Sequence, residues 1–266
     1  MILVIGEPGT GKSVLLQQLM YSCLKNSGEP CVFLTFEGPP IAVEQDMQSL
    51  GWDLKPYIDR GLFRFVDCFS FRMEPVDLPD YVTPIKDPKD LVQITSILVR
   101  IMEQMKMIGR GAVFIDSLTE MFTLVQETRP LIYTMLEGIK AWRAKGPKER
   151  LVPFFCLHHT GLKAYSDMED LLFYSTDGIF DLRFHPGFAE RGLLVRQFRV
   201  RKLKGAPHET FWTTFSIGSQ GLEEIQLPPP SLGEVSLVPS VVKEDETKPI
   251  RKREAARRVQ EASAHS

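Results

Sequence analysis

The chain has 266 residues, of which 43% are hydrophobic and 25% are charged, the composition of an ordinary globular protein. Its formal net charge of -2 gives no overall attraction to nucleic acid or to an anionic membrane, and no apolar run approaches the roughly 20 residues of a membrane span. No membrane partner is therefore expected. The four cysteines are widely spaced, without a C-x-x-C pair, which favours reduced thiols and a cytoplasmic location.

Strand and helix signals alternate through the first half of the chain, which is typical of an α/β protein with a mainly parallel sheet flanked by helices. Residues 68–86 carry many prolines and polar residues and are expected to form an excursion loop. The predicted elements are strand 2–5, helix 12–24, strand 31–36, a short helix between Pro40 and Gly51, strand 63–67 and a helix from Asp87 to Gly109.

In the second half, strand 113–115, a helix centred on 131–142 and strand 151–157 are predicted. Segments 179–184, 193–203 and 210–217 alternate apolar and polar residues between turns, which indicates antiparallel strands added at the far edge of the sheet. Residues 228–266 begin with three prolines and continue as a polar, charged stretch, so a disordered tail is expected after a single folded domain, 1–227.

The most informative motif lies directly after the first predicted strand. Residues 6–13 are G-E-P-G-T-G-K-S, which fits the phosphate-binding pattern G-x-x-x-x-G-K-[ST] and leads into a predicted helix. Glycines let the backbone approach phosphate oxygens, Lys12 would contact the β- and γ-phosphates, and Ser13 would ligate Mg²⁺. A chance glycine-rich turn is the alternative, but it does not explain the strand and helix on either side. The predicted binding residues are Gly6, Glu7, Pro8, Gly9, Thr10, Gly11, Lys12, Ser13 and Val14.

A second motif is the apolar strand 113–115, which delivers Asp116 at its carboxyl end. Ligands of open α/β sheets collect at this end of the strands, so Asp116 is predicted to hold Mg²⁺ through water opposite Ser13. An aspartate that only caps a turn is the alternative. Because the same chain also carries a phosphate loop upstream, the metal-binding interpretation of Asp116 is favoured.

Glu37 follows strand 31–36 and would point toward the same edge of the sheet. A carboxylate there can orient water for attack on the γ-phosphate, although position alone does not distinguish it from a solvated strand-end glutamate. The base is predicted to be adenine, because a guanine-reading N-K-x-D element needs an asparagine and the sole candidate, Asn26, precedes serine. ATP and Mg²⁺ are the expected ligands.

Two further groups of residues leave alternatives open. His158 and His159 end strand 151–157, where they either sense the γ-phosphate or are satisfied strand-end histidines. The tail's positive charges either bind a protein partner or nucleic acid, or form a solvated end; they are Arg251, Lys252, Arg253, Arg257 and Arg258.

Several segments resemble KaiC-like ATPases of the RecA superfamily, in the family's order and over residues 2 to about 226. They are F-E-G at 36–38, S-L-G-W-D-L at 49–54, S-T-D-G-I at 175–179, R-V-R-K-L-K-G-A-P-H at 199–208 and the closing strand with Gly221-Leu222. The resemblance implies a RecA-like fold, a catalytic role for Glu37, and a Lys202–Lys204 pair that reaches a neighbouring subunit's nucleotide. It also implies self-association as a filament or a ring, with a hexamer as one form. From charge alone, a solvated basic face is the preferred interpretation of that hairpin.

The chain departs from the family at three points. Gly38 replaces a second glutamate, Lys204 replaces an arginine, and the segment that the family carries before the first strand does not precede Met1. We therefore expect slow ATP hydrolysis completed at a subunit interface. The alternatives are an ATP-dependent regulatory switch that does not hydrolyse ATP and an accessory protein of DNA recombination.

Overall fold

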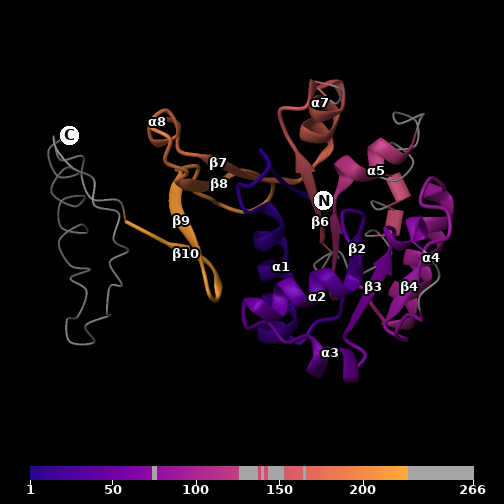
Figure 1. The fold of residues 1–266 in the computed structure, drawn as a ribbon. Coiled ribbons are helices and arrows are strands. Elements are labelled where there is room, and N and C mark those ends of the chain that lie inside the picture. The colour runs from indigo at the N-terminus through magenta and orange to yellow at the C-terminus, as the bar shows by residue number, and fades with distance from the viewer. Residues whose placement is uncertain (74–76, 126–136, 139–140, 143–152, 164–165, 227–266) are drawn as a thin grey trace, which may run out of the picture. The chain divides into compact units, whose positions relative to one another are not determined.

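The computed structural model describes residues 1–73, 77–125, 137–138, 141–142, 153–163 and 166–226 (Figure 1). These residues belong to one compact unit, Met1–Leu227. The predicted tail, 228–266, and most of the helix predicted at 131–142 lie outside the described residues.

Across the described part of the chain, ten strands form one sheet in the order β10-β9-β8-β7-β1-β6-β5-β2-β3-β4. The strands from β7 to β4 in this order pair in parallel, and β8, β9 and β10 pair antiparallel at one edge. The bounds are β1 Ile2–Gly6, β2 Cys31–Thr35, β3 Phe63–Asp67, β4 Val82–Pro84, β5 Ala112–Asp116, β6 Phe154–His159, β7 Gly178–Phe184, β8 Arg196–Leu203, β9 Thr213–Gly218 and β10 Gly221–Glu224.

Helices cover both faces of the parallel part of the sheet (Figure 1). α1, α2 and α3 pack on one face, and α4, α5 and α7 pack on the other. The bounds are α1 Lys12–Ser22, α2 Pro40–Ser49, α3 Lys55–Asp59, α4 Leu91–Gln104, α5 Leu118–Leu124, α7 Ser166–Ser175 and α8 Pro186–Ala189, with a π-helical turn at Cys23–Ser27 and a 3-10 turn at Ser70–Arg72.

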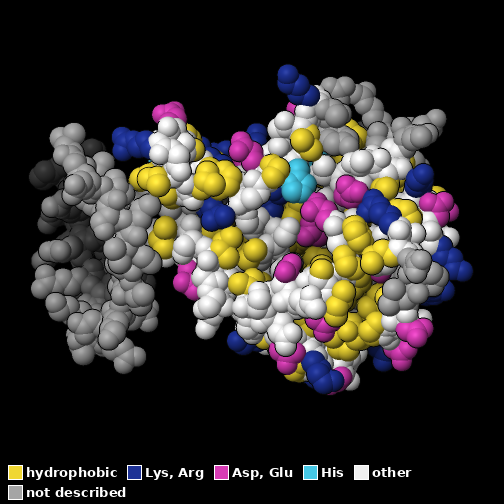
Figure 2. Space-filling view, viewed as in Figure 1, with side chains coloured by type: hydrophobic (Ala, Val, Ile, Leu, Met, Phe, Trp, Pro, Cys, Tyr) yellow, Lys and Arg dark blue, Asp and Glu magenta, His cyan; other side chains and the backbone are white. Residues whose placement is uncertain are grey.

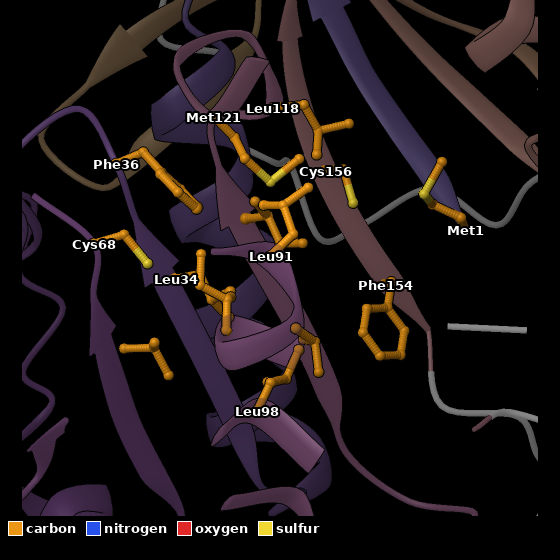
Figure 3. Packing of buried hydrophobic residues seen from close by; sticks show 14 of the residues in the cluster. Met1, Leu34, Phe36, Cys68, Leu91, Leu98, Leu118, Met121, Phe154 and Cys156 are labelled. Carbon is orange, nitrogen blue, oxygen red and sulfur yellow. The ribbon is translucent and has the colours of Figure 1, made fainter. Parts of the chain in front are cut away.

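The core follows from the alternation of side chains along the central strands. In β2, Phe33 joins the cluster under α1 and α2, whereas its neighbours Val32 and Leu34 join the cluster under α4 and α5. Figure 3 shows Leu34 among residues of that second cluster, including Leu91 and Leu98 of α4. All residues of β2 and β5 are buried. Such continuous apolar runs are expected of parallel strands covered on both faces, and they fix the edge where the strands end.

The predicted α/β fold with a mainly parallel sheet and antiparallel edge strands is confirmed, with local corrections. Segment 179–184 was expected to add antiparallel, but β7 pairs in parallel with β1, with Gly6 opposite Leu182, and only its other side pairs antiparallel with β8. The expected excursion loop 68–86 contains the short strand β4, which extends the sheet beyond β3. Three residues of strand carry too little apolar periodicity to be recognised.

Within the described residues, no helix has both the length and the apolar character needed to cross a membrane.

Candidate active site

The phosphate loop joins β1 to α1 at the carboxyl edge of the parallel strands. Gly6 has a φ of 150°, and a Cβ placed there would lie 2.3 Å from the backbone oxygen of Leu182 on β7. Gly9 and Gly11 also have positive φ values, 81° and 97°, which glycine adopts without a steric penalty. The loop conformation therefore depends on these glycines and on close contact with the adjacent strand.

Lys12 is 3% exposed and donates a 2.7 Å hydrogen bond from Nζ to the carbonyl oxygen of Glu7. The Thr10 hydroxyl donates to the same carbonyl at 2.8 Å. Burial lowers the pKa of Lys12 to about 8, although the carboxylates of Glu37 and Asp116 oppose the shift. At neutral pH the loop thus holds a buried cation at the N-terminus of a helix, where anions are stabilised.

Asp116 ends β5 and is 6% exposed. Burial raises its pKa to about 7 and the charge of Glu37 adds to the shift, while a hydrogen bond with Ser13 and the charges of His159 and Lys12 oppose it. Its Oδ1 is buried without a hydrogen-bond partner among the described residues. An acceptor oxygen left without a partner beside a serine hydroxyl fits a hard divalent cation, so Ser13 and Asp116 could together hold Mg²⁺.

Glu37 lies just beyond the end of β2. The preceding residue, Phe36, donates a 2.7 Å hydrogen bond from its backbone N–H to the carbonyl oxygen of Asp116 at the end of β5. Oε1 of Glu37 lies 2.8 Å from Nε2 of His159. Burial alone would raise the pKa of Glu37, but hydrogen bonds from His159 and Ser117 and the charge of Lys12 outweigh it, so the pKa is lowered from its ordinary value. Glu37 is therefore an ionised carboxylate next to the phosphate loop.

The two histidines at the end of β6 have different surroundings. His158 is fully buried, with Nδ1 3.0 Å from the Thr119 hydroxyl, and its burial lowers its pKa to about 4. His159 is half-buried and faces Glu37. Of the two alternatives left open by the sequence, the strand-end role fits His158, whereas His159 lines the pocket beside the loop and contacts Glu37.

A pocket of about 410 Å³ opens beside the loop, and Glu37 and His159 form part of its wall. Arg72, which was not predicted as a site residue, lines this pocket from the segment expected to be an excursion loop. Its Nη2 donates to Oε1 of Glu120 at 2.7 Å. A lone arginine in an irregular segment carries no sequence signal. The full lining is Pro8, Phe36, Glu37, Phe69, Arg72, Thr119, Glu120, His159 and Leu162.

The predicted Lys202–Lys204 pair lies away from this chain's own loop. Lys202 on β8 is opposite Ile179, which is opposite Leu3, so it lies near the start of β1 rather than at Gly6. Its Nζ donates to the carbonyl of Phe173 at 2.7 Å, near the last turn of α7, and Lys204 is exposed directly after β8. The structure therefore brings together the loop, Glu37 and Asp116, but not the two lysines.

Two arginines of the same edge contact the ring of Trp212, with Cζ of Arg183 3.8 Å and Cζ of Arg199 4.3 Å from its centroid. Arg196 at the other end of β8 donates from Nε to the Gly9 carbonyl at 3.1 Å, a loop contact that the sequence did not predict. Basic and hydrophobic side chains accordingly lie side by side over β7–β10 (Figure 2).

A glycine loop after the first strand of a parallel sheet, with a strand-end aspartate beside its serine, defines a P-loop nucleotide-binding protein with a RecA-like fold. The family model for KaiC ATPases matches residues 1–227, and the chain belongs to this family.

Relatives and a solved structure agree with this assignment. A UPF0273 protein of Aeropyrum pernix is 28% identical over 226 residues, 83% of each chain. A UPF0273 protein of Methanopyrus kandleri is 27% identical over 226 residues, 83% of this chain and 82% of the relative. The crystal structure of a KaiC-like protein of Pyrococcus horikoshii has the same fold, with a TM-score of 0.65 and 21% identity over 85% of this chain and 88% of that chain.

Proposed function

We propose that this KaiC-family domain binds ATP with Mg²⁺ and hydrolyses it slowly. The observation that carries the proposal is the position of Glu37, an ionised carboxylate that lines the pocket next to Pro8 of the phosphate loop and is held by His159. Membership of an ATPase family supports nucleotide binding, and the orphaned Asp116 oxygen supports a metal.

In the proposed reaction the loop amides and Lys12 bind the phosphates and stabilise the negative charge that develops on them. Mg²⁺, when held by Ser13 and Asp116, neutralises phosphate charge. Glu37 accepts a hydrogen bond from a water in the pocket and orients it in line with the γ-phosphate. His159 holds Glu37 in place and lies where it can respond to the γ-phosphate.

Two features support slow rather than fast turnover. The pKa of Glu37 is lowered, and a carboxylate with a lower pKa accepts a proton from water less readily. Gly38 leaves the position after Glu37 without a second carboxylate. The same features favour the second candidate function, an ATP-dependent switch that binds nucleotide and changes its assembly without hydrolysis.

A Glu37→Gln variant tests the proposal. The amide cannot act as a base, so the variant should retain Mg-ATP binding but lose steady-state phosphate release by roughly a hundredfold or more. Glu103→Gln, an exposed glutamate of α4, is the matched control and should keep the parental rate. A parental rate in the Glu37→Gln variant would refute hydrolysis by this site. If the parent itself binds ATP without turnover, the switch is favoured.

A further inference from the structure

A chain of contacts runs from Glu37 into the interior behind the pocket. The backbone N–H of His159 donates to the Thr119 hydroxyl at 2.8 Å, and the same hydroxyl lies 3.0 Å from Nδ1 of His158. Thr119 belongs to α5 and is 7% exposed. One buried hydroxyl thus joins both histidines of β6, and His159 in turn contacts Glu37.

The proton arrangement along this chain follows from the groups present. The Thr119 oxygen already accepts a hydrogen bond from His159 N–H, and its own proton has His158 Nδ1 within reach as an acceptor. His158 is neutral, since burial lowers its pKa to about 4, and with the Thr119 hydroxyl donating to Nδ1 the imidazole proton is on Nε2. That N–H points away from the pocket toward α7.

On α7, Oε1 of Glu169 lies 3.6 Å from Nε2 of His158, which is beyond hydrogen-bond distance. Both atoms are buried, and neither has a hydrogen-bond partner among the described residues. A donor and an acceptor left unsatisfied at this separation favour a closer approach, because each buried unpaired group costs free energy. A small movement of α7 toward β6 would therefore make a bond that the present arrangement lacks.

We propose that Thr119 and His158 are positioning residues for Glu37 and that Glu169 links them to α7. Thr119 fixes His159, and His159 sets the orientation of the carboxylate, so a shift of α7 acts on hydrolysis from outside the nucleotide site. This inference rests on the proposed role of Glu37 as the residue that orients water.

The test compares isosteric and conservative variants at Thr119. Thr119→Val removes the hydroxyl at nearly constant volume and should lower kcat for ATP about tenfold, while the Kd for Mg-ATP stays within about twofold. Thr119→Ser keeps a hydroxyl and should recover most of the parental kcat. A purely structural role would instead change the thermal midpoint and the Kd together, or leave kcat unchanged in the folded variant, and either result overturns the proposal.

Glu169 gives a second test that does not depend on a fully buried residue. Glu169→Ala should lower kcat by about threefold or more, whereas Glu169→Gln keeps an acceptor oxygen and should recover the rate. The exposed neighbour Asp170 provides the control, because Asp170→Ala should keep the parental kcat. Parental kcat in the Glu169→Ala variant overturns the link to α7.

The double variant Thr119→Val/Glu169→Ala should lose no more activity than Thr119→Val alone, because Glu169 is proposed to act on Glu37 only through His158 and Thr119. If the two losses of kcat multiply in the double variant, the proposed link from Glu169 through Thr119 to Glu37 is overturned. The outcome is separable from that of the proposed function. If Glu37→Gln loses turnover while Thr119→Val does not, this inference fails alone; if Glu37→Gln hydrolyses ATP at the parental rate, the proposed function itself fails.

Discussion

Lys12 and Glu7 close the phosphate loop on itself through the 2.7 Å hydrogen bond between the lysine amine and the glutamate carbonyl. The bond holds a buried cation in the middle of the loop and would be exchanged for a phosphate oxygen when nucleotide binds. A hydrogen bond between the ammonium and an ionised phosphate is stronger than one to an uncharged carbonyl. Lys12 should therefore contribute to affinity for ATP more than to the stability of the loop.

Substitution of Lys12 by alanine should abolish tight binding of Mg-ATP while the fold persists. The loss of a charge-assisted contact to phosphate is expected to cost about 2 kcal/mol or more, a weakening of roughly 30-fold in Kd. Isothermal titration calorimetry measures the affinity and circular dichroism checks the fold. The exposed Lys89 supplies the matched control, Lys89→Ala. Unchanged affinity in a folded Lys12→Ala protein would contradict the binding site.

Gly6→Ala should destabilise the protein because its Cβ would overlap the Leu182 backbone oxygen, 2.3 Å away, at a positive φ. Strain and overpacking together predict a loss of about 2 kcal/mol or more in the free energy of unfolding. The control is Gly38→Ala, where a Cβ meets nothing within 4 Å, and its effect should stay within about 0.5 kcal/mol. Equal stability of the two variants in urea unfolding would argue against the close contact between β1 and β7.

His158 should make stability depend on pH in the acid range. Its pKa is lowered from 6.5 to about 4, so the unfolded chain binds more protons between these values. The contribution is fully present above about pH 6.5 and is lost as the pH falls to about 4, on the order of 3 kcal/mol in all. His158→Asn, which does not titrate, should lose this dependence. Urea unfolding at several pH values gives the parent-minus-variant difference, which should increase from pH 4 to pH 6.5.

The difference in free energy of unfolding between parent and variant is needed because Asp116 changes stability with pH in the opposite direction to His158. Its raised pKa, about 7, makes stability fall as the pH rises from about 4 to 7 in both proteins, so the contribution cancels in the subtraction. A His158→Asn difference that is constant across the window would show that this histidine is not buried in its neutral form.

The sequence was sufficient for the parts of the molecule with strong local signals. Alternating apolar strands and helices predicted the sheet, and the motif at 6–13 located the loop because its glycines are required by backbone geometry. Glu37 and Asp116 were found since each follows an apolar strand, and parallel strands end at a common edge. The glycine motif and the apolar strands are short-range sequence patterns, and they were enough to place these residues at the carboxyl edge of the sheet.

The contacts around the site depended on tertiary packing and could not be predicted. Thr119 follows Asp116 by three residues, yet its contact with β6 depends on how α5 lies against the sheet. Arg72 reaches the pocket from an irregular segment, and Glu169 approaches His158 from α7. The parallel pairing of β7 with β1 was likewise missed, because alternation shows that a strand is half-buried but does not show its direction.

Assembly should be visible in the concentration dependence of ATP turnover. If Lys202 and Lys204 complete a neighbour's site, specific activity should rise with protein concentration, and Mg-ATP should promote the oligomer by reciprocal linkage. Mixing Lys202→Ala/Lys204→Ala subunits with Glu37→Gln subunits should restore part of the activity, since some interfaces then hold one intact glutamate and one intact lysine pair. Gel filtration with and without nucleotide measures the assembly. Constant specific activity of a monomer across a wide dilution series would contradict it.

In such an assembly, the 2.7 Å hydrogen bond between Lys202 Nζ and the Phe173 carbonyl would compete with a contact between Lys202 and the neighbour's phosphate. An ammonium has three N–H donors, so the contacts exclude each other only where the neighbour's phosphate lies beyond the reach of the amine in its present position; Lys202 then has to leave the last turn of α7. Each interface that recruits Lys202 in this way would leave a helix terminus uncapped, at a cost of about 0.5–1 kcal/mol. Self-association would thus have a built-in penalty, and loosening of α7 would accompany the binding of each neighbour. Dissociation would recap the helix, so the same lysine would favour release once the neighbour's phosphate has departed.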